Sequence, residues 1–106
     1  MNESEFLELV DSTLDRIEDS VDESGADIEP ARTGTVLTLE FDNGSKIIVN
    51  RHTAAREIWV AAKSGGYHFK LDEPGQGRWL GTRDGVELLA ALSRCVSEQA
   101  GVAVSL

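Results

Sequence analysis

The sequence contains little that would place it outside the cell or in a membrane. Its only cysteine, Cys95, cannot form a disulfide within the chain, and a protein without disulfides suits the reducing cytoplasm. No apolar run approaches the roughly 18 residues that a membrane-spanning helix requires. The opening residues Met1-Asn2-Glu3 do not start a signal peptide. We therefore expect one globular cytoplasmic domain over residues 1–106, with no membrane association.

Signatures of catalysis are also missing. The chain has no Ser/His/Asp spacing, no P-loop, no Gly-x-Gly-x-x-Gly before a helix and no His/Cys metal cluster. Cys95 falls within an expected helix beside Val96, which predicts a partly buried, inert thiol rather than a nucleophile. The sequence predicts a protein that is not an enzyme.

Basic residues are scarce: 10 Lys and Arg stand against 19 Asp and Glu, for a formal net charge of −9. Nucleic acids and anionic membranes would repel such a surface, which argues against both as partners. The imbalance is concentrated at one end. The first 31 residues hold eleven acids and one base, Arg16, whereas residues 32–106 are close to neutral.

This acidic segment predicts a helix over residues 3–23, begun by a capping box of Asn2 and Glu5. Apolar residues and acids both recur at steps of three and four, on faces roughly 125° apart. The apolar positions are Phe6, Val10, Leu14, Ile17 and Val21, and the acidic ones are Glu8, Asp11, Asp15, Glu18 and Asp22, with Asp19 beside them. One helix therefore has a core face and a separate, dense row of carboxylates.

Such a row is unfavourable for stability. Like charges three or four residues apart repel by about 0.2–0.5 kcal/mol per pair, so the acids of this helix together cost roughly 2–4 kcal/mol before screening by salt. A face that served only solubility would mix Lys among the acids, and this one does not. The pattern favours a surface that meets cations, a basic protein surface, or both, over a merely solvated face.

The rest of the chain predicts six strands and a second helix. The expected strands are 27–32, 35–41, 45–51, 56–62, 67–71 and 78–81, and the helix is 84–100. Asp42-Asn43-Gly44 predicts a type I′ hairpin turn, Lys63 to Gly66 a second turn, and residues 75–77 lead into the last strand. The positions expected to face the core are Leu37, Leu39, Phe41, Ile47, Val49, Ile58, Val60, Ala62, Tyr67, Phe69, Leu71, and, on the helix, Val86, Leu89, Ala90, Leu92, Ser93 and Val96. Residues 102–106 are apolar enough to pack back on this core.

Antiparallel hairpins flanked by helices predict an α+β fold, a two-layer α/β sandwich with both terminal helices on one face of the sheet. The open face is expected to show Thr38, Glu40, Lys46, Ile48, Asn50, Trp59, Ala61, His68 and Lys70. Trp59 is unusual there, because an exposed indole on a sheet is typical of a binding anchor. Trp79 is expected in the core. His52, in the loop after the third strand, and His68 are expected to be surface residues rather than ligands.

Several stretches, taken in order, resemble the frataxin family and its bacterial branch. They are the acidic first helix, Phe41 to Arg51 (FDNGSKIIVNR), Ile58 to Ala61 (IWVA), Gly65 to Phe69 (GGYHF), Trp79-Leu80 and Asp84-Gly85 before the last helix. The resemblance covers essentially the whole chain. The departures are His52 and Glu57, where the family usually has Gln, and Ala54-Ala55 in its proline region.

The resemblance implies a frataxin-like sandwich that binds iron, Fe²⁺ or Fe³⁺, through acids of the first helix and first strand, and that serves iron–sulfur cluster assembly. The implied iron ligands are six helix residues, Asp11, Asp15, Glu18, Asp19, Asp22 and Glu23, which we call the acidic ridge, together with Asp27 and Glu29. The implied partners are a cysteine desulfurase and the cluster scaffold. Their contacts are expected at Glu18 and Asp22 on the ridge and at Asn50 and Trp59 on the sheet.

Carboxylates on a convex helix offer a cation only two or three ligands at once, so water must complete the shell. Iron bound in this way is held weakly and with poor selectivity among divalent metals. The first reading is therefore an iron chaperone or a regulator of the desulfurase, a monomer that metal could drive into oligomers. The alternative is an acidic regulator that docks on an Arg-rich partner, with metal binding incidental. A third reading, a ferroxidase, lacks buried ligands at di-iron spacing.

Overall fold

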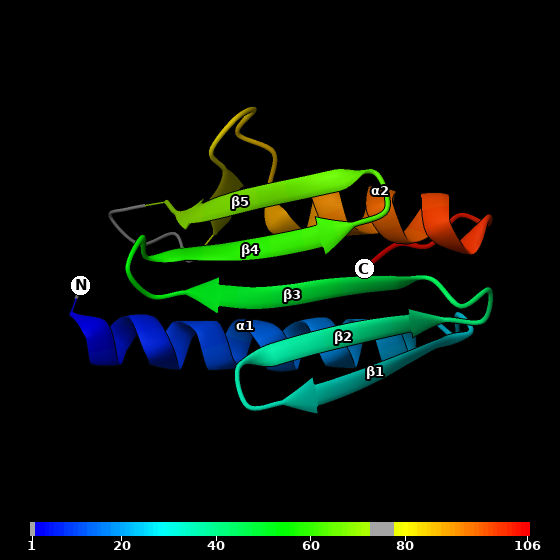
Figure 1. Cartoon of the computed structure of the whole chain (residues 1–106), viewed down its shortest axis with the longest axis horizontal. Coiled ribbons are helices and arrows are strands. Elements are labelled where there is room, and N and C mark those ends of the chain that lie inside the picture. Colours follow the sequence, from blue (N-terminus) through cyan, green and yellow to red (C-terminus); the bar gives the residue numbers. More distant parts are fainter. Residues whose placement is uncertain (1, 73–77) are drawn as a thin grey trace.

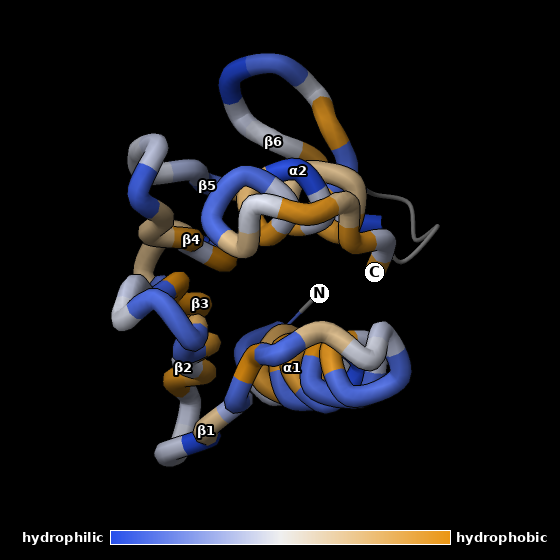
Figure 2. The backbone as a smooth tube through the Cα atoms, turned by 90° about the vertical axis from the view of Figure 1, so that its right-hand side faces the viewer, coloured by the Kyte–Doolittle hydropathy of each residue, from blue (hydrophilic) through white to orange (hydrophobic). Residues whose placement is uncertain are grey.

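The chain folds into two layers, with one antiparallel sheet and both helices on the same face of it (Figure 1). The computed structural model describes residues 2–72 and 78–106. In the rotated view the sheet lies on the left and both helices lie on its right side, α2 above α1 (Figure 2). The predicted two-layer sandwich is confirmed.

Helix α1, Glu3–Glu23, has the predicted bounds and the predicted start. The Asn2 side chain accepts a hydrogen bond from the Glu5 amide at 2.8 Å, and the Glu5 carboxylate accepts one from the Asn2 amide at 3.4 Å. This capping box satisfies two amide donors that have no partner within the helix. The five predicted apolar positions of α1 are all buried.

The sheet has the strand order β1-β2-β3-β4-β5-β6, so every strand pairs with its neighbour in sequence. The strands are β1 (Ile28–Thr33), β2 (Val36–Phe41), β3 (Lys46–His52), β4 (Glu57–Ala62), β5 (Gly65–Leu71) and β6 (Trp79–Gly81). Pro30 lies in β1, at the sheet edge, where its missing amide hydrogen is tolerated. The alternation predicted for the strands is confirmed, since Leu37, Val49, Ile58 and Phe69 are buried against the helices.

Helix α2, Leu88–Ala100, begins four residues later than the sequence predicts. Gly85 has a φ of +72°, outside the helical region. The amide of Val86 donates to the Asp84 carboxylate, and Glu87 forms an isolated antiparallel bridge with Leu80, so residues 84–87 are not helical. Glu87 caps the helix instead, accepting from the amides of Leu89 and Ala90. The buried face is correspondingly rotated from the expected one: Ala90 is exposed, and the buried residues are Leu88, Ala91, Leu92, Cys95, Val96 and Gln99.

Two turns also differ from prediction. A type I′ turn requires positive φ at two central residues, yet between β2 and β3 only Gly44 has one, at +86°. The Gly44 amide bonds to the Phe41 carbonyl and the Phe41 amide to the Ser45 carbonyl, which makes a three-residue loop closed by a glycine bulge. Gly65 and Gly66 pair with β4 as part of β5 rather than forming the turn. Residues 75–77, expected to lead into the last strand, lie outside the described residues.

Val104 and Leu106 pack back on the core, as predicted for the C-terminal residues. The Ser97 hydroxyl bonds to both backbone groups of Val104, and the Leu106 amide bonds to the Ser93 hydroxyl. Val102, by contrast, is 62% exposed. Within the described ranges, neither helix is long and apolar enough to cross a membrane.

Candidate metal and partner-binding surfaces

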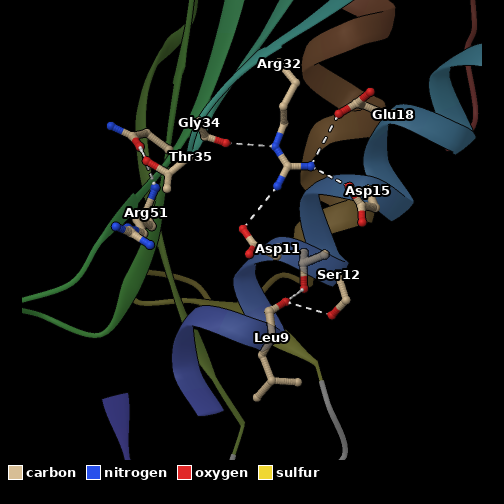
Figure 3. A network of polar contacts seen from close by, with 11 residues as sticks. Leu9, Asp11, Ser12, Asp15, Glu18, Arg32, Gly34, Thr35 and Arg51 are labelled. Atoms are coloured by element: carbon tan, nitrogen blue, oxygen red, sulfur yellow. Dashed lines mark hydrogen bonds and ion pairs between the residues drawn. The ribbon is translucent and has the colours of Figure 1, made fainter. Parts of the chain in front are cut away.

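A base that the sequence did not predict lies against the first half of the acidic ridge. Arg32, on edge strand β1, reaches across to α1, where its guanidinium contacts three ridge carboxylates (Figure 3). The nitrogen–oxygen distances are 3.1 Å to Asp11, 2.5 Å to Asp15 and 3.4 Å to Glu18. The fourth contact is a hydrogen bond from Nε of Arg32 to the Gly34 carbonyl at 3.2 Å, so each guanidinium nitrogen has a partner.

These contacts hold Arg32 in its charged form. Partial burial alone would lower the pKa of the guanidinium, but hydrogen bonds to Asp15 and Glu18 and the charges of Asp15 and Asp11 outweigh burial and raise that pKa. The Arg32 side chain is 20% exposed, whereas Asp11 and Asp15 are 59% and 69% exposed. The ridge is therefore not a row of unpaired acids over its whole length, and the repulsion expected from sequence is partly offset here.

The other half of the ridge keeps the expected character. Asp19, Asp22 and Glu23 are exposed in the last turns of α1. Among the residues that the structure describes, they form no ion pair. No base lies in this last turn either, so the carbonyl end of the helix adds to the local negative charge.

The two further acids implied as ligands lie outside helix α1. Glu29 is opposite Glu40 in the sheet register, and both are exposed on the face away from the helices. Asp27 precedes β1 and lines a hollow with Asp42 and Asn43 of the β2–β3 turn. The eight predicted ligands thus fall into three places: the ridge, the hollow by the β2–β3 turn, and the open sheet.

Within residues 2–72 and 78–106, no group of three or more His, Cys, Asp or Glu side chains converges as a metal site would. Exposed carboxylates on a helix can still approach a hydrated cation two at a time, with water supplying the remaining ligands. The described carboxylates of the ridge do not, however, form a preformed chelate.

The open face carries a second distinctive arrangement, centred on Trp59 of β4. Its indole is stacked between two imidazoles, with ring centroids 3.9 Å from His52 and 4.2 Å from His68, and interplanar angles of 5° and 7°. Nε1 of Trp59 donates to Glu57 at 2.7 Å, and Nδ1 of His68 lies 3.6 Å from the same carboxylate oxygen. Trp59 remains 36% exposed, as the strand alternation predicted, but both faces of its ring are covered.

The position predicted for His52 was wrong. His52 was expected in a loop, yet it is the last residue of β3, diagonal to Trp59 across the β3–β4 pair. Its Nδ1 also accepts the Ala55 amide at 3.3 Å, which ties the next turn to the stack. Asn50 is directly opposite Trp59 in the register, as expected for the open face. The alternation of β3, extended one residue further, was the signal that would have found His52.

The remaining aromatic residue of interest belongs to the core. Trp79 is 3% exposed, donates to the Thr13 hydroxyl at 3.0 Å and meets the Phe6 ring edge-on at 6.1 Å. Cys95 is fully buried, beyond the partial burial that the sequence predicted. Neither residue is available to a partner.

Comparisons with known proteins agree on one family. A family model for the frataxin-like domain matches residues 1–102. The iron–sulfur cluster assembly protein CyaY of Ralstonia nicotianae is 56% identical, over 100% of this chain and 95% of its own. The solved frataxin of Psychromonas ingrahamii is 37% identical, with a TM-score of 0.90 over 99% of this chain and 97% of that one. A frataxin of Saccharomyces cerevisiae, described as trimeric and complexed with ferrous iron, is 28% identical, with a TM-score of 0.71 over 87% of this chain and 84% of that one.

Proposed function

The chain belongs to the frataxin-like family, and from that premise we propose that it is an iron-binding protein of iron–sulfur cluster assembly. It delivers iron to this process or regulates the cysteine desulfurase that supplies the sulfur, and it is not itself an enzyme. We place it in the cytoplasm, as a monomer that iron can assemble further, since a yeast member is described as a trimer complexed with ferrous iron.

The observation that carries this proposal is the relation to a CyaY protein over the full length of the chain, combined with the exposed carboxylates of the ridge. We propose that iron binds Asp19, Asp22 and Glu23 together with Asp11, Asp15 and Glu18. Asp27 and Glu29, which lie apart from the ridge, are proposed as separate, weaker sites. Such iron remains hydrated and exchanges readily, which suits delivery or sensing.

The proposed partners are the cysteine desulfurase and the cluster scaffold. Glu18 and Asp22 would meet a basic surface of the desulfurase, because dense exposed charge of one sign steers association with the opposite sign. Asn50 and Trp59 would contact the assembly complex on the sheet side. There the stack of Trp59 with His52 and His68 presents a rigid aromatic edge with little entropy to lose on binding.

A specific contact favours a second candidate function. Three ridge carboxylates already bind a guanidinium, that of Arg32, so the ridge is chemically suited to arginine side chains of a partner. In this reading the protein is an acidic regulator that docks on an Arg-rich surface, and metal binding is incidental.

One reconstituted assay tests the proposal and separates the candidates. Sulfide release by the desulfurase and cluster formation on the scaffold are measured with graded amounts of this protein, with and without Fe²⁺. An effect that depends on iron supports the first function, and an equal effect without iron supports the second. No effect on either reaction under both conditions, together with no binding to desulfurase or scaffold, would contradict both.

A further inference from the structure

The carboxylates of Asp11, Asp15 and Glu18 already have a cationic partner, the guanidinium of Arg32. The three acids come from successive turns of α1 on the side next to β1, and their oxygens converge on one positive group from another strand (Figure 3). The guanidinium is fixed from behind by its bond to the Gly34 carbonyl. It is therefore held in place by the sheet as well as by the helix.

A cation that binds these three acids through the oxygens facing Arg32 has to displace the guanidinium. The same oxygens cannot direct their lone pairs at both the guanidinium and a metal, and a metal placed beside an intact Arg32 would meet its positive charge at close range. Displacement is also opposed by the Gly34 hydrogen bond, which Arg32 keeps only in its present position. In the other half of the ridge no paired base opposes a cation, because Asp19, Asp22 and Glu23 form no ion pair among the described residues.

We propose that Arg32 is a built-in competitor that divides the acidic ridge into two unequal halves. Asp19, Asp22 and Glu23 are open to divalent cations, whereas Asp11, Asp15 and Glu18 are reserved by the guanidinium and accept a cation only after Arg32 leaves. This inference rests on the proposed iron-binding function and specifies how that site is regulated. Arg32 sets the affinity and the number of cations bound, and it touches the carboxylates rather than the iron.

The test is calorimetric titration of the full chain with Fe²⁺ under anaerobic conditions, comparing wild type, Arg32→Gln and Arg16→Gln. Arg16 is exposed on α1, the helix that carries the ridge, and forms no ion pair among the described residues. Arg16→Gln removes one positive charge, as Arg32→Gln does. We expect Arg32→Gln to gain cation binding and to raise the affinity about five- to tenfold over Arg16→Gln, on the scale of losing two or three exposed ion pairs. Arg32→Lys keeps the positive charge but lacks the planar guanidinium, so its Fe²⁺ affinity should lie between those of Arg32→Gln and wild type.

A measurement on the wild-type protein guards against a variant that folds poorly. The wild-type protein is titrated with Mg²⁺, and the signal of the ¹⁵N-bound Nε proton of Arg32 is followed by NMR. We expect the amide signals near Asp22 to shift first. The Arg32 signal should move only at higher Mg²⁺ concentration. Equal binding by Arg32→Gln and Arg16→Gln, or weaker binding by Arg32→Gln, would overturn the inference and leave the iron function standing. Absence of Fe²⁺ binding in all three proteins would instead contradict the proposed iron function.

Discussion

The indole of Trp59 and the imidazole of His52 lie face to face, with ring centroids 3.9 Å apart and planes 5° from parallel. They belong to neighbouring strands and occupy diagonal positions of the register. Since His68 covers the other face of the indole, a partner can reach only the exposed edge of Trp59 and the outer faces of the imidazoles. The open sheet therefore offers a small preassembled aromatic unit rather than a free tryptophan side chain.

We expect the His52 and Trp59 side chains to be energetically coupled. A double-mutant cycle with His52→Ala and Trp59→Ala should give a coupling of about 0.5–1.5 kcal/mol in the free energy of unfolding, the range for stacked aromatic pairs. Urea denaturation of the four proteins measures it. The matched control pairs Trp59→Ala with Arg16→Ala, because Arg16 is exposed on α1 and forms no ion pair among the described residues, and this cycle should be additive. Equal couplings in both cycles would contradict the stack.

The two tryptophans should separate stability from binding. Trp79→Ala removes a core ring and should lower the free energy of unfolding by about 3–5 kcal/mol. Trp59→Ala loses only stacking and one hydrogen bond and should lower it by about 1–2 kcal/mol. Binding of the Trp59 variant to desulfurase and scaffold should nevertheless weaken by roughly 2 kcal/mol or more if Trp59 is an interface hot spot. Denaturation beside a quantitative pull-down decides both points. A larger stability loss for Trp59→Ala would contradict the assignment of the sheet faces.

The sequence was sufficient to predict the elements that depend on interactions between residues close in the chain. The period of Phe6, Val10, Leu14, Ile17 and Val21 and the Asn2–Glu5 capping box determined α1 to the residue. The alternation in β2 to β5 correctly identified which face is buried and placed Trp59 outside. The start of α2 was missed because Asp84 resembles an N-cap, while Gly85 takes a backbone conformation that no helix allows.

What the sequence could not show is contact between distant residues. Arg32 lies 14 to 21 positions after its three carboxylates, and nothing local links them until β1 is placed beside α1. The same holds for Glu29, which the family resemblance implies as an iron ligand together with the ridge but which lies on the other face of the sheet once the register is set. Counting like charges along α1 therefore overestimated the repulsion, since the compensating base came from another element.

Neutralising single ridge acids should have unequal effects on stability along α1. Asp22→Asn relieves repulsion from Glu18 and Asp19 and should raise the free energy of unfolding by about 0.4–1 kcal/mol. Asp15→Asn relieves repulsion from Asp11, Glu18 and Asp19 but also removes the shortest ion pair of Arg32, so the two effects should nearly cancel. The Asp22 change corresponds to a shift of about 2–8 °C in Tm for a domain of this size, in metal-free buffer of low salt. Thermal melts followed by circular dichroism measure both variants. If Asp15→Asn melts as high as Asp22→Asn, repulsion dominates the whole ridge and the Arg32 pairs contribute nothing.

The ridge should also control the rate at which the protein meets its desulfurase. We expect the association rate to fall steeply from low to high salt, because screening weakens long-range attraction to a basic patch.

Asp22→Lys is the informative charge reversal, since Glu18→Lys would also place a cation beside Arg32 and disturb the fold. It should slow association about tenfold at low salt without lowering Tm. Glu98→Lys carries the same charge change on α2, where Glu98 has only a long contact of 4.0 Å to Arg94, and should slow association far less. Stopped-flow or surface plasmon resonance kinetics at several salt concentrations distinguish the two variants. Equal rates for Asp22→Lys, Glu98→Lys and wild type would exclude the ridge as the docking surface.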